Sequence, residues 1–291
     1  MNRYHSSSCK TAYLIMRPVL SILAGIFFYF QSATSSAQSQ SSSVSIKQSD
    51  EQQTAHPIQV PVQDENQEVV ILVSGAGEWE VIQKEFFSNV PKESTPYGEW
   101  FLAEMPLEDD IFEVAFFYNG PGAIFAGGAT QYAIDRWSPK LMIHLGVCNG
   151  FEGSVNKEEL LIVERIVASA TKITTDIDLS WLGAAATAWA KKGVIASGDK
   201  PIQTPAEMAN LKNQFGALAW DRESASVSSI ASVNKVRLLV IKSVACLLGN
   251  DPKAYEKQEI PVPVLKKLLD ESLKMIPFWI SRSSLEINEA P

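Results

Sequence analysis

Acidic side chains follow two apolar runs of this chain closely. Glu78 and Glu80 come shortly after residues 69–74, and Glu223 comes shortly after residues 217–220. A carboxylate is ionised at neutral pH, so it can take a proton from water or accept hydrogen bonds from the hydroxyls of a sugar. The ordinary alternative for each residue is an acid in the first turn of a helix, where the helix dipole favours negative charge.

Glycine turns and polar residues follow other apolar runs. The turn Gly120-Pro121-Gly122 could hold phosphate on its backbone N–H groups, or it could be only a tight turn. Asp199, in Ser197-Gly198-Asp199, could be structural or could contact a ligand. His144 lies inside an apolar run, which predicts a hydrogen-bonded core residue rather than a catalyst. Each of these signals is weak by itself.

The elements that must position these residues alternate along the chain. Apolar runs bounded by glycine or polar residues predict strands, and the amphipathic stretches between them predict helices. The predicted strands are 69–74, 112–118, 141–145, 160–167, 194–197, 217–220 and 236–244, and the predicted helices are 78–87, 123–137, 181–192, 205–215, 223–233 and 264–276. This order predicts an α/β fold, a three-layer sandwich with a mostly parallel central sheet. Ligands of such sheets bind at the carboxyl ends of the strands, where the polar residues above would lie.

Five sequence blocks occur in the order, and at about the spacing, of a known family. They are Gly120-Pro121-Gly122, residues 129–135, 144–151 and 175–182, and Trp220-Asp221-Arg222-Glu223-Ser224. Over residues 69–255 the chain resembles the methylthioadenosine/adenosylhomocysteine nucleosidase branch of the nucleoside phosphorylase superfamily. The resemblance implies that superfamily's fold and the cleavage of purine nucleosides at the N-glycosidic bond, through an oxocarbenium-like sugar. We expect no cofactor and no metal.

The resemblance also implies a role for each site residue. Glu80, or Glu78 if the turn shifts register, would orient the attacking water, and Glu223 would hydrogen-bond the ribose hydroxyls. The turn of residues 147–149 would face the base. The expected substrate-binding residues are Glu78, Gly122, Val147, Cys148, Asn149, Asp199, Asp221, Arg222 and Glu223. The expected partner is a small nucleoside, with phosphate as a second possibility.

Three departures from the family pattern bear on activity. The catalytic acid that protonates the leaving purine falls on Cys246, and a thiol is a weak hydrogen-bond donor. Residues 168–174 form a shorter segment than the family has, and Asn149 stands where members often have glycine. Two hypotheses follow: a nucleosidase or phosphorylase-like enzyme impaired by loss of its general acid, and a catalytically silent nucleoside-binding or storage protein with the same fold. The sequence leaves open the preferred base and whether water or phosphate is the acceptor.

The N-terminal region has the pattern of an export signal. Residues 1–37 combine a basic start, a short apolar core and small residues ending at Ala37, which is typical of a secretory signal peptide. We therefore expect a secreted or periplasmic protein, with an uncleaved N-terminal anchor as the alternative. Residues 38–68 are rich in Ser, Gln and acidic residues and predict a disordered polar linker. Residues 69–291 would then form one nucleoside phosphorylase-like domain.

The charge of the exported chain limits its partners. Residues 1–37 hold three of the 25 basic residues and none of the 33 acidic ones, so their removal leaves 22 against 33, a net charge of −11. Nucleic acid and anionic membranes are therefore poor partners, and the apolar run is too short for a stable membrane span. Only Cys148 and Cys246 remain, too few for a disulfide framework, although one disulfide between them is a minor alternative. We expect a homo-oligomer.

Overall fold

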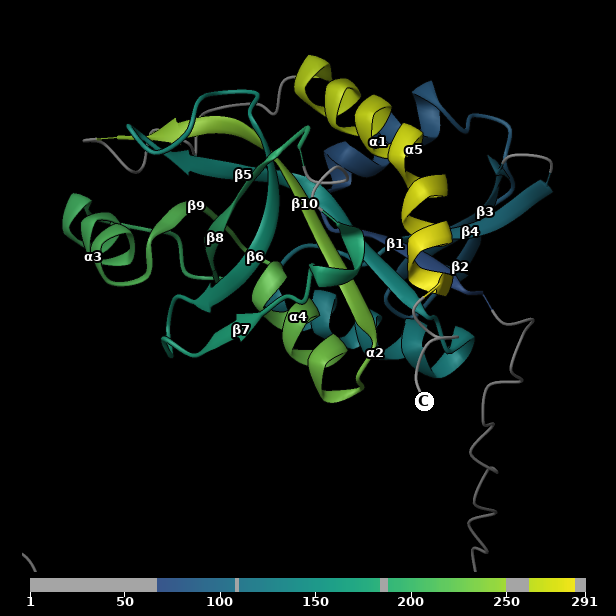
Figure 1. The fold of residues 1–291 in the computed structure, drawn as a ribbon, viewed down its shortest axis with the longest axis horizontal. Coiled ribbons are helices and arrows are strands. Elements are labelled where there is room, and N and C mark those ends of the chain that lie inside the picture. The colour runs from purple at the N-terminus through teal and green to yellow at the C-terminus, as the bar shows by residue number, and fades with distance from the viewer. Residues whose placement is uncertain (1–66, 108–109, 184–187, 250–261, 286–291) are drawn as a thin grey trace, which may run out of the picture. The chain divides into compact units, whose positions relative to one another are not determined.

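The computed structural model describes residues 67–107, 110–183, 188–249 and 262–285 (Figure 1). The chain divides into two units, Met1–Pro57 and Ile58–Pro291, and every described residue belongs to the second. The predicted signal peptide, residues 1–37, lies outside the described residues. So does the predicted linker, apart from Gln67 and Glu68.

Within the described residues, ten strands form one sheet. Their bounds are β1 Val69–Val73, β2 Glu93–Thr95, β3 Gly98–Leu107, β4 Asp110–Tyr118, β5 Leu141–Phe151, β6 Leu160–Ala168, β7 Thr174–Asp176, β8 Lys191–Ser197, β9 Ala217–Asp221 and β10 Arg237–Leu248. The hydrogen-bonded order is β10-β6-β8-β9-β5-β1-β4-β3-β2, with β7 paired to β6. Because β10 also pairs with β5, the strands β10, β6, β8, β9 and β5 close into a ring.

Parallel and antiparallel pairs are mixed in this sheet. Strands β4, β1, β5 and β10 run parallel to one another, as do β6, β8 and β9. The pairs β2–β3, β3–β4, β5–β9, β6–β7 and β6–β10 are antiparallel. The predicted α/β class is confirmed. The sheet is more mixed than the mostly parallel one that we expected, because the β3–β4 hairpin and the closure of the ring both need antiparallel pairs.

Helices cover both faces of the sheet (Figure 1). Their bounds are α1 Ala76–Glu85, α2 Ala123–Trp137, α3 Pro205–Phe215, α4 Ser224–Val233 and α5 Val262–Leu285, with a short 3₁₀ turn at Ser180–Leu182. Ile71 of β1 joins a core cluster with residues of α1 and α5, whereas its neighbour Leu72 joins a second cluster with residues of α2 and α4. This alternation is the strand period of two, and it gives the three layers that we expected. None of the described helices combines the length and apolar composition needed to cross a membrane.

The sequence signals at the two ends of helix α3 predict its bounds correctly. The Thr204 hydroxyl accepts a hydrogen bond from the Glu207 N–H, and the Glu207 carboxylate accepts one from the Thr204 N–H, which is a capping box. Gly216 ends the helix with a φ of 68°, a left-handed conformation that glycine adopts easily. The predicted bounds, 205–215, are confirmed.

The predicted helix 181–192 is wrong where the structure describes it. Only Ser180–Leu182 forms a helical turn, residues 184–187 lie outside the described part, and strand β8 begins at Lys191. Alanine favours a helix, but β8 pairs with β6 on one side and with β9 on the other, and this non-local pairing outweighs local propensity. Strands β2, β3 and β7 were not predicted.

Candidate active site

Glu78 turns inward from the first turn of α1 and is only 6% exposed. Its Oε1 accepts a hydrogen bond from the backbone N–H of Val147 at 3.3 Å. Its Oε2 is buried and has no hydrogen-bond partner among the described residues. A Cβ atom at position 75 would overlap this carboxylate, so Gly75 leaves the space that it needs. Because a buried oxygen without a partner is costly, Oε2 is suited to accept a hydrogen bond from water or from a ligand.

Glu80 lies on the exposed side of α1. Successive residues of an α-helix are about 100° apart around its axis, so Glu78 and Glu80 cannot face the same site. The sequence favoured Glu80 and kept Glu78 as the alternative; the structure places Glu78 inside and Glu80 at the surface.

Glu223 lies directly before α4 and contacts the turn that precedes α2. Its Oε1 accepts a hydrogen bond from the N–H of Gly122 at 2.9 Å. Burial, and next the negative charge of Asp221, raise the pKa of Glu223 to about 7, although Lys242 and the Gly122 N–H act in the opposite direction. The Glu223 carboxyl group therefore changes its charge near neutral pH.

Tyr118, the last residue of β4, connects the two carboxylates. Burial raises the pKa of its phenol, and the negative charges of Glu78 and Glu223 raise it further. Both carboxylates thus act electrostatically on this hydroxyl. We call Glu78, Tyr118 and Glu223 the carboxylate site. Sequence reasoning missed Tyr118, although its position at the end of an apolar run and before a glycine turn was a usable signal.

The backbone N–H groups of the glycine turn before α2 already donate hydrogen bonds to carboxylates. The Gly122 N–H donates to Glu223, and the Ala123 N–H donates to Asp199 Oδ1 at 2.8 Å. Gly122 has a φ of +84°, and a Cβ there would lie 2.9 Å from the same Asp199 oxygen, so the position requires glycine. The Arg222 guanidinium lies 3.9 Å from Asp199, and both side chains are about half exposed. Asp199 and Arg222 thus form the outer edge of this turn.

Asp221 lies beneath the carboxylate site in a buried polar network. Its Oδ2 pairs with the Lys242 ammonium at 3.1 Å and accepts a hydrogen bond from the Ser224 hydroxyl. The ammonium also lies 3.3 Å from Nε2 of His144, and Ser224 Oγ lies 3.2 Å from Nδ1 of the same ring. Burial, and next the charge of Lys242, hold the pKa of His144 well below its ordinary value. The imidazole is therefore neutral. Its Nε2 lies within hydrogen-bond distance of both Lys242 Nζ and Ser74 Oγ, and its Nδ1 within hydrogen-bond distance of Ser224 Oγ.

Two members of this network, Asp221 and Ser224, lie two residues before and one residue after Glu223. The network therefore fixes the backbone on both sides of Glu223. Asp221 was expected to contact the substrate, but its side chain is 3% exposed and is bonded to Lys242 and Ser224. His144 is the hydrogen-bonded core residue that its sequence position predicts. Sequence reasoning missed Lys242, although a lone charge inside the apolar run 236–244 must be paired if it is buried.

Cys148 and Cys246 lie on the neighbouring strands β5 and β10, and both are buried free thiols. Cys148 packs in the core cluster under α2 and α4, and burial raises its pKa far above the ordinary value. Only its backbone can therefore face a ligand. Cys246 donates its S–H to Asn149 Oδ1 at 2.6 Å. Burial raises the pKa of Cys246 to about 11, so this thiol is protonated at neutral pH.

Comparisons with known proteins give one consistent result. No family model matches the chain. The 5′-methylthioadenosine/S-adenosylhomocysteine nucleosidase of Maridesulfovibrio salexigens is 24% identical over 189 residues, which is 56% of this chain and 79% of the relative. The corresponding enzyme of Anoxybacillus flavithermus is 24% identical over 212 residues, or 65% and 90% of the two chains.

Solved structures of the same kind of protein share the fold. S-adenosylhomocysteine nucleosidase from Streptococcus pyogenes, in complex with 5-methylthiotubericidin, matches with a TM-score of 0.61 at 13% identity, covering 73% of this chain and 97% of that one. The nucleosidase from Colwellia psychrerythraea, in complex with adenine, matches with a TM-score of 0.59 at 16% identity, covering 74% and 96%. In sequence the chain is similar to methylthioadenosine/adenosylhomocysteine nucleosidases, and it shares the fold of their solved structures.

The segment of residues 168–174, expected to be shorter than in the family that the chain resembles, forms a compact turn. The Ala168 N–H donates to the Ile173 carbonyl at 2.8 Å, and the chain returns directly as β7, antiparallel to β6. Residues 168–174 therefore form a tight hairpin turn, and the Ser169 N–H donates to the Ser197 carbonyl, two residues before Asp199.

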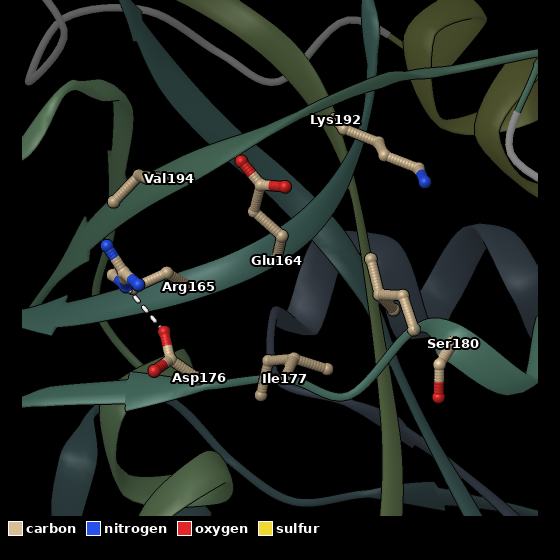
Figure 2. Close-up of a pocket in the computed structure, with 8 residues that line it drawn as sticks. Glu164, Arg165, Asp176, Ile177, Ser180, Lys192 and Val194 are labelled. Carbon is tan, nitrogen blue, oxygen red and sulfur yellow. Dashed lines mark hydrogen bonds and ion pairs between the residues drawn. The ribbon is translucent and has the colours of Figure 1, made fainter.

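A hollow of about 510 Å³ lies beside this hairpin (Figure 2). It is lined by Glu164, Arg165, Asp176, Ile177, Leu179, Ser180, Lys192 and Val194. An ion pair of 2.5 Å between Arg165 and Asp176 crosses it. None of the site residues expected from the sequence lines the hollow. In the described part of the chain, no group of three or more His, Cys, Asp or Glu side chains could hold a metal ion.

Proposed function

We propose that the protein hydrolyses the N-glycosidic bond of a purine nucleoside, at a rate limited by the lack of a strong general acid. The observation that carries the proposal is the buried Glu78 carboxylate, whose Oε2 has no hydrogen-bond partner among the described residues. The negative charges of Glu78 and Glu223 both raise the pKa of the Tyr118 phenol. The names of the relatives support the reaction class, and the solved relatives with a nucleoside analogue or adenine bound support the ligand class.

Each carboxylate has one task in the proposed reaction. Glu78 accepts a proton from the attacking water through Oε2, while its Oε1 stays fixed by the Val147 N–H. The water oxygen bonds to C1′ of the sugar as the bond from C1′ to the base nitrogen breaks, and the electron pair leaves with the base. Glu223 accepts hydrogen bonds from the ribose hydroxyls and stabilises the positive charge that develops on the sugar.

Water fits this site better than phosphate as the acceptor. The Gly122 and Ala123 N–H groups, which could have held a phosphate, donate to Glu223 and Asp199 instead. Glu78 adds a further negative charge nearby, so a phosphate dianion would be repelled.

The leaving base receives little help from Cys246. A thiol whose pKa is about 11 donates a proton poorly to a ring nitrogen. Loss of a positioned acid costs roughly a hundredfold to ten-thousandfold in rate. This loss, with the compact turn 168–174, favours the second candidate function, a nucleoside-binding or storage protein without turnover.

Matched variants of the two acids of α1 test the proposal. Purified protein is incubated with methylthioadenosine, adenosine and inosine, with and without phosphate, and free base is measured by chromatography. We expect slow base release without phosphate, a loss of about a hundredfold or more in Glu78→Gln, and a change within about twofold in Glu80→Gln. A larger loss of base release in Glu80→Gln than in Glu78→Gln would contradict the role of Glu78. If calorimetry shows nucleoside binding and no base is released, the second candidate function, a nucleoside-binding or storage protein, is supported instead.

A further inference from the structure

Large apolar side chains are exposed on helices α2 and α4. Ile124, near the start of α2, is 84% exposed, and Val233, the last residue of α4, is 81% exposed. Phe125 of α2 and Tyr97, which packs against α2, are exposed as well. The described residues include eight exposed large hydrophobic side chains, and half of them lie here. Single exposed apolar residues are ordinary, whereas a group of them marks an interaction surface.

The exposed residues of the two helices belong to one surface, because α2 and α4 lie side by side (Figure 1). A Cβ atom at Gly127 of α2 would lie 3.6 Å from the Ser226 side chain and 4.0 Å from that of Ile230, both on α4. Ile124 comes three residues before Gly127, and Val233 three residues after Ile230. Residues three apart are neighbours on a helix surface, so both exposed side chains flank this contact.

Tyr97 extends the same surface on the other side of α2. A Cβ atom at Gly128 would lie 2.5 Å from the Tyr97 ring, so the ring rests directly on the helix there. Phe125 comes three residues before Gly128, and the Tyr97 ring also contacts that of Tyr132, with 5.8 Å between the centroids. We call Tyr97, Ile124, Phe125 and Val233 the apolar helix face.

The two helices carry no charged residue along this face. Residues 123–134 of α2 and 224–233 of α4 include no Asp, Glu, Lys or Arg, although one residue in five of the chain is charged. Helices α1, α3 and α5 each carry both acidic and basic residues. The centres of protein interfaces are poor in charged residues and rich in aromatic ones. The apolar helix face has this composition.

We propose that the apolar helix face binds a second copy of this chain. In a two-fold symmetric dimer the same surface lies on both sides, so a charge at its centre would meet the like charge of the other copy. The chain has a net charge of −8, so two copies approach closely only where both lack negative charge. A basic protein would need acidic residues on the face, and an anionic membrane would need basic ones.

The interface would begin next to the carboxylate site of each copy, because Gly122 directly precedes α2 and Glu223 directly precedes α4. The inference goes beyond the proposed function and does not depend on it, since self-association needs no nucleoside.

Two acidic substitutions at equivalent helix positions test the inference. Ile124→Glu places an acid in the first turn of α2, and Val262→Glu places one in the first turn of α5, which packs on the opposite face of the sheet. The helix dipole favours an acid at both positions, so both variants should fold. Sedimentation equilibrium of the purified proteins at micromolar concentrations should give the mass of a dimer for wild type and for Val262→Glu. In Ile124→Glu the dissociation constant of the dimer should rise about a hundredfold or more, because a charge is buried in the interface.

Val233→Lys keeps the inference testable if Ile124→Glu does not fold. It adds a cation to the last turn of α4, where the helix dipole favours one, and should weaken the dimer by a similar factor. A monomeric wild type would overturn the inference. So would a dimer that neither substitution weakens, or one that Val262→Glu weakens equally. None of these results bears on the proposed function, which base release measures separately.

Discussion

Glu223 has a carboxyl group whose charge changes in the physiological pH range. Burial, and next Asp221, raise its pKa to about 7, so it is ionised above this pH and protonated below it. The ionised form can accept hydrogen bonds from two hydroxyls, whereas the protonated form loses that capacity in part. Nucleoside binding should therefore weaken as the pH falls through 7, by up to about tenfold between pH 8 and pH 6, the limit for a protonated form that does not bind.

Calorimetric titrations at pH 6, 7 and 8 measure this dependence. Glu223→Gln removes the ionisable group, so its weaker binding should stay constant over the same range. Glu80→Gln, altered on the exposed side of α1, should retain the wild-type dependence. A wild-type protein whose affinity is constant from pH 6 to pH 8 would show that Glu223 does not bind the ribose.

Restoring an acid at position 246 should require a second change. In Cys246→Asp the new carboxylate would attract the Asn149 NH₂ group, and a hydrogen bond to a carboxylate lowers its pKa and weakens it as an acid. We expect little gain in base release from Cys246→Asp alone. The same substitution added to Asn149→Gly should raise the rate about tenfold or more over Asn149→Gly. Base release from inosine at pH 7 measures this, and a tenfold gain from the single variant would argue against the pairing.

At the scale of elements, the buried ion pair between Lys242 and Asp221 joins β10 to the last residue of β9. Lys242→Met would leave the Asp221 carboxylate buried without its cation, and breaking a buried pair in this way costs about 3 to 5 kcal/mol of unfolding free energy. The double variant Lys242→Met/Asp221→Asn should regain part of that loss, because no charge is left unpaired. Lys192→Met is the matched control, because the Lys192 side chain on β8 is exposed, and it should cost under about 1 kcal/mol of unfolding free energy. Urea unfolding monitored by tryptophan fluorescence gives all four values, and equal losses in the two lysine variants would contradict a stabilising role for the pair.

Elements with local signals could be predicted, and elements that depend on distant partners could not. The Thr204 cap and Gly216 specify α3 within a dozen residues of sequence. Strand β8 is predicted over residues 194–197, but its start at Lys191 depends on pairing with β6, which the alanine-rich sequence before it does not reveal. In the site, Glu223 could be predicted from its place after a strand. The choice between Glu78 and Glu80 depends on where α1 starts, and a shift of two residues rotates the helix by about 200°.

For the whole molecule, the remaining question is where it acts. We propose that the chain is exported and cleaved after Ala37, so that the mature protein begins at Gln38 with a net charge of −11. Cys9 lies in the removed segment, and Cys148 and Cys246 are buried free thiols. Protein from the exported fraction should therefore show two thiols after unfolding without reductant, and almost none while folded, because buried, protonated thiols react slowly. N-terminal sequencing combined with this thiol count tests the proposal. A chain that starts at Met1 with three thiols would mean that the segment is retained, and a chain that starts at Gln38 with none would mean that the two cysteines become oxidised after export.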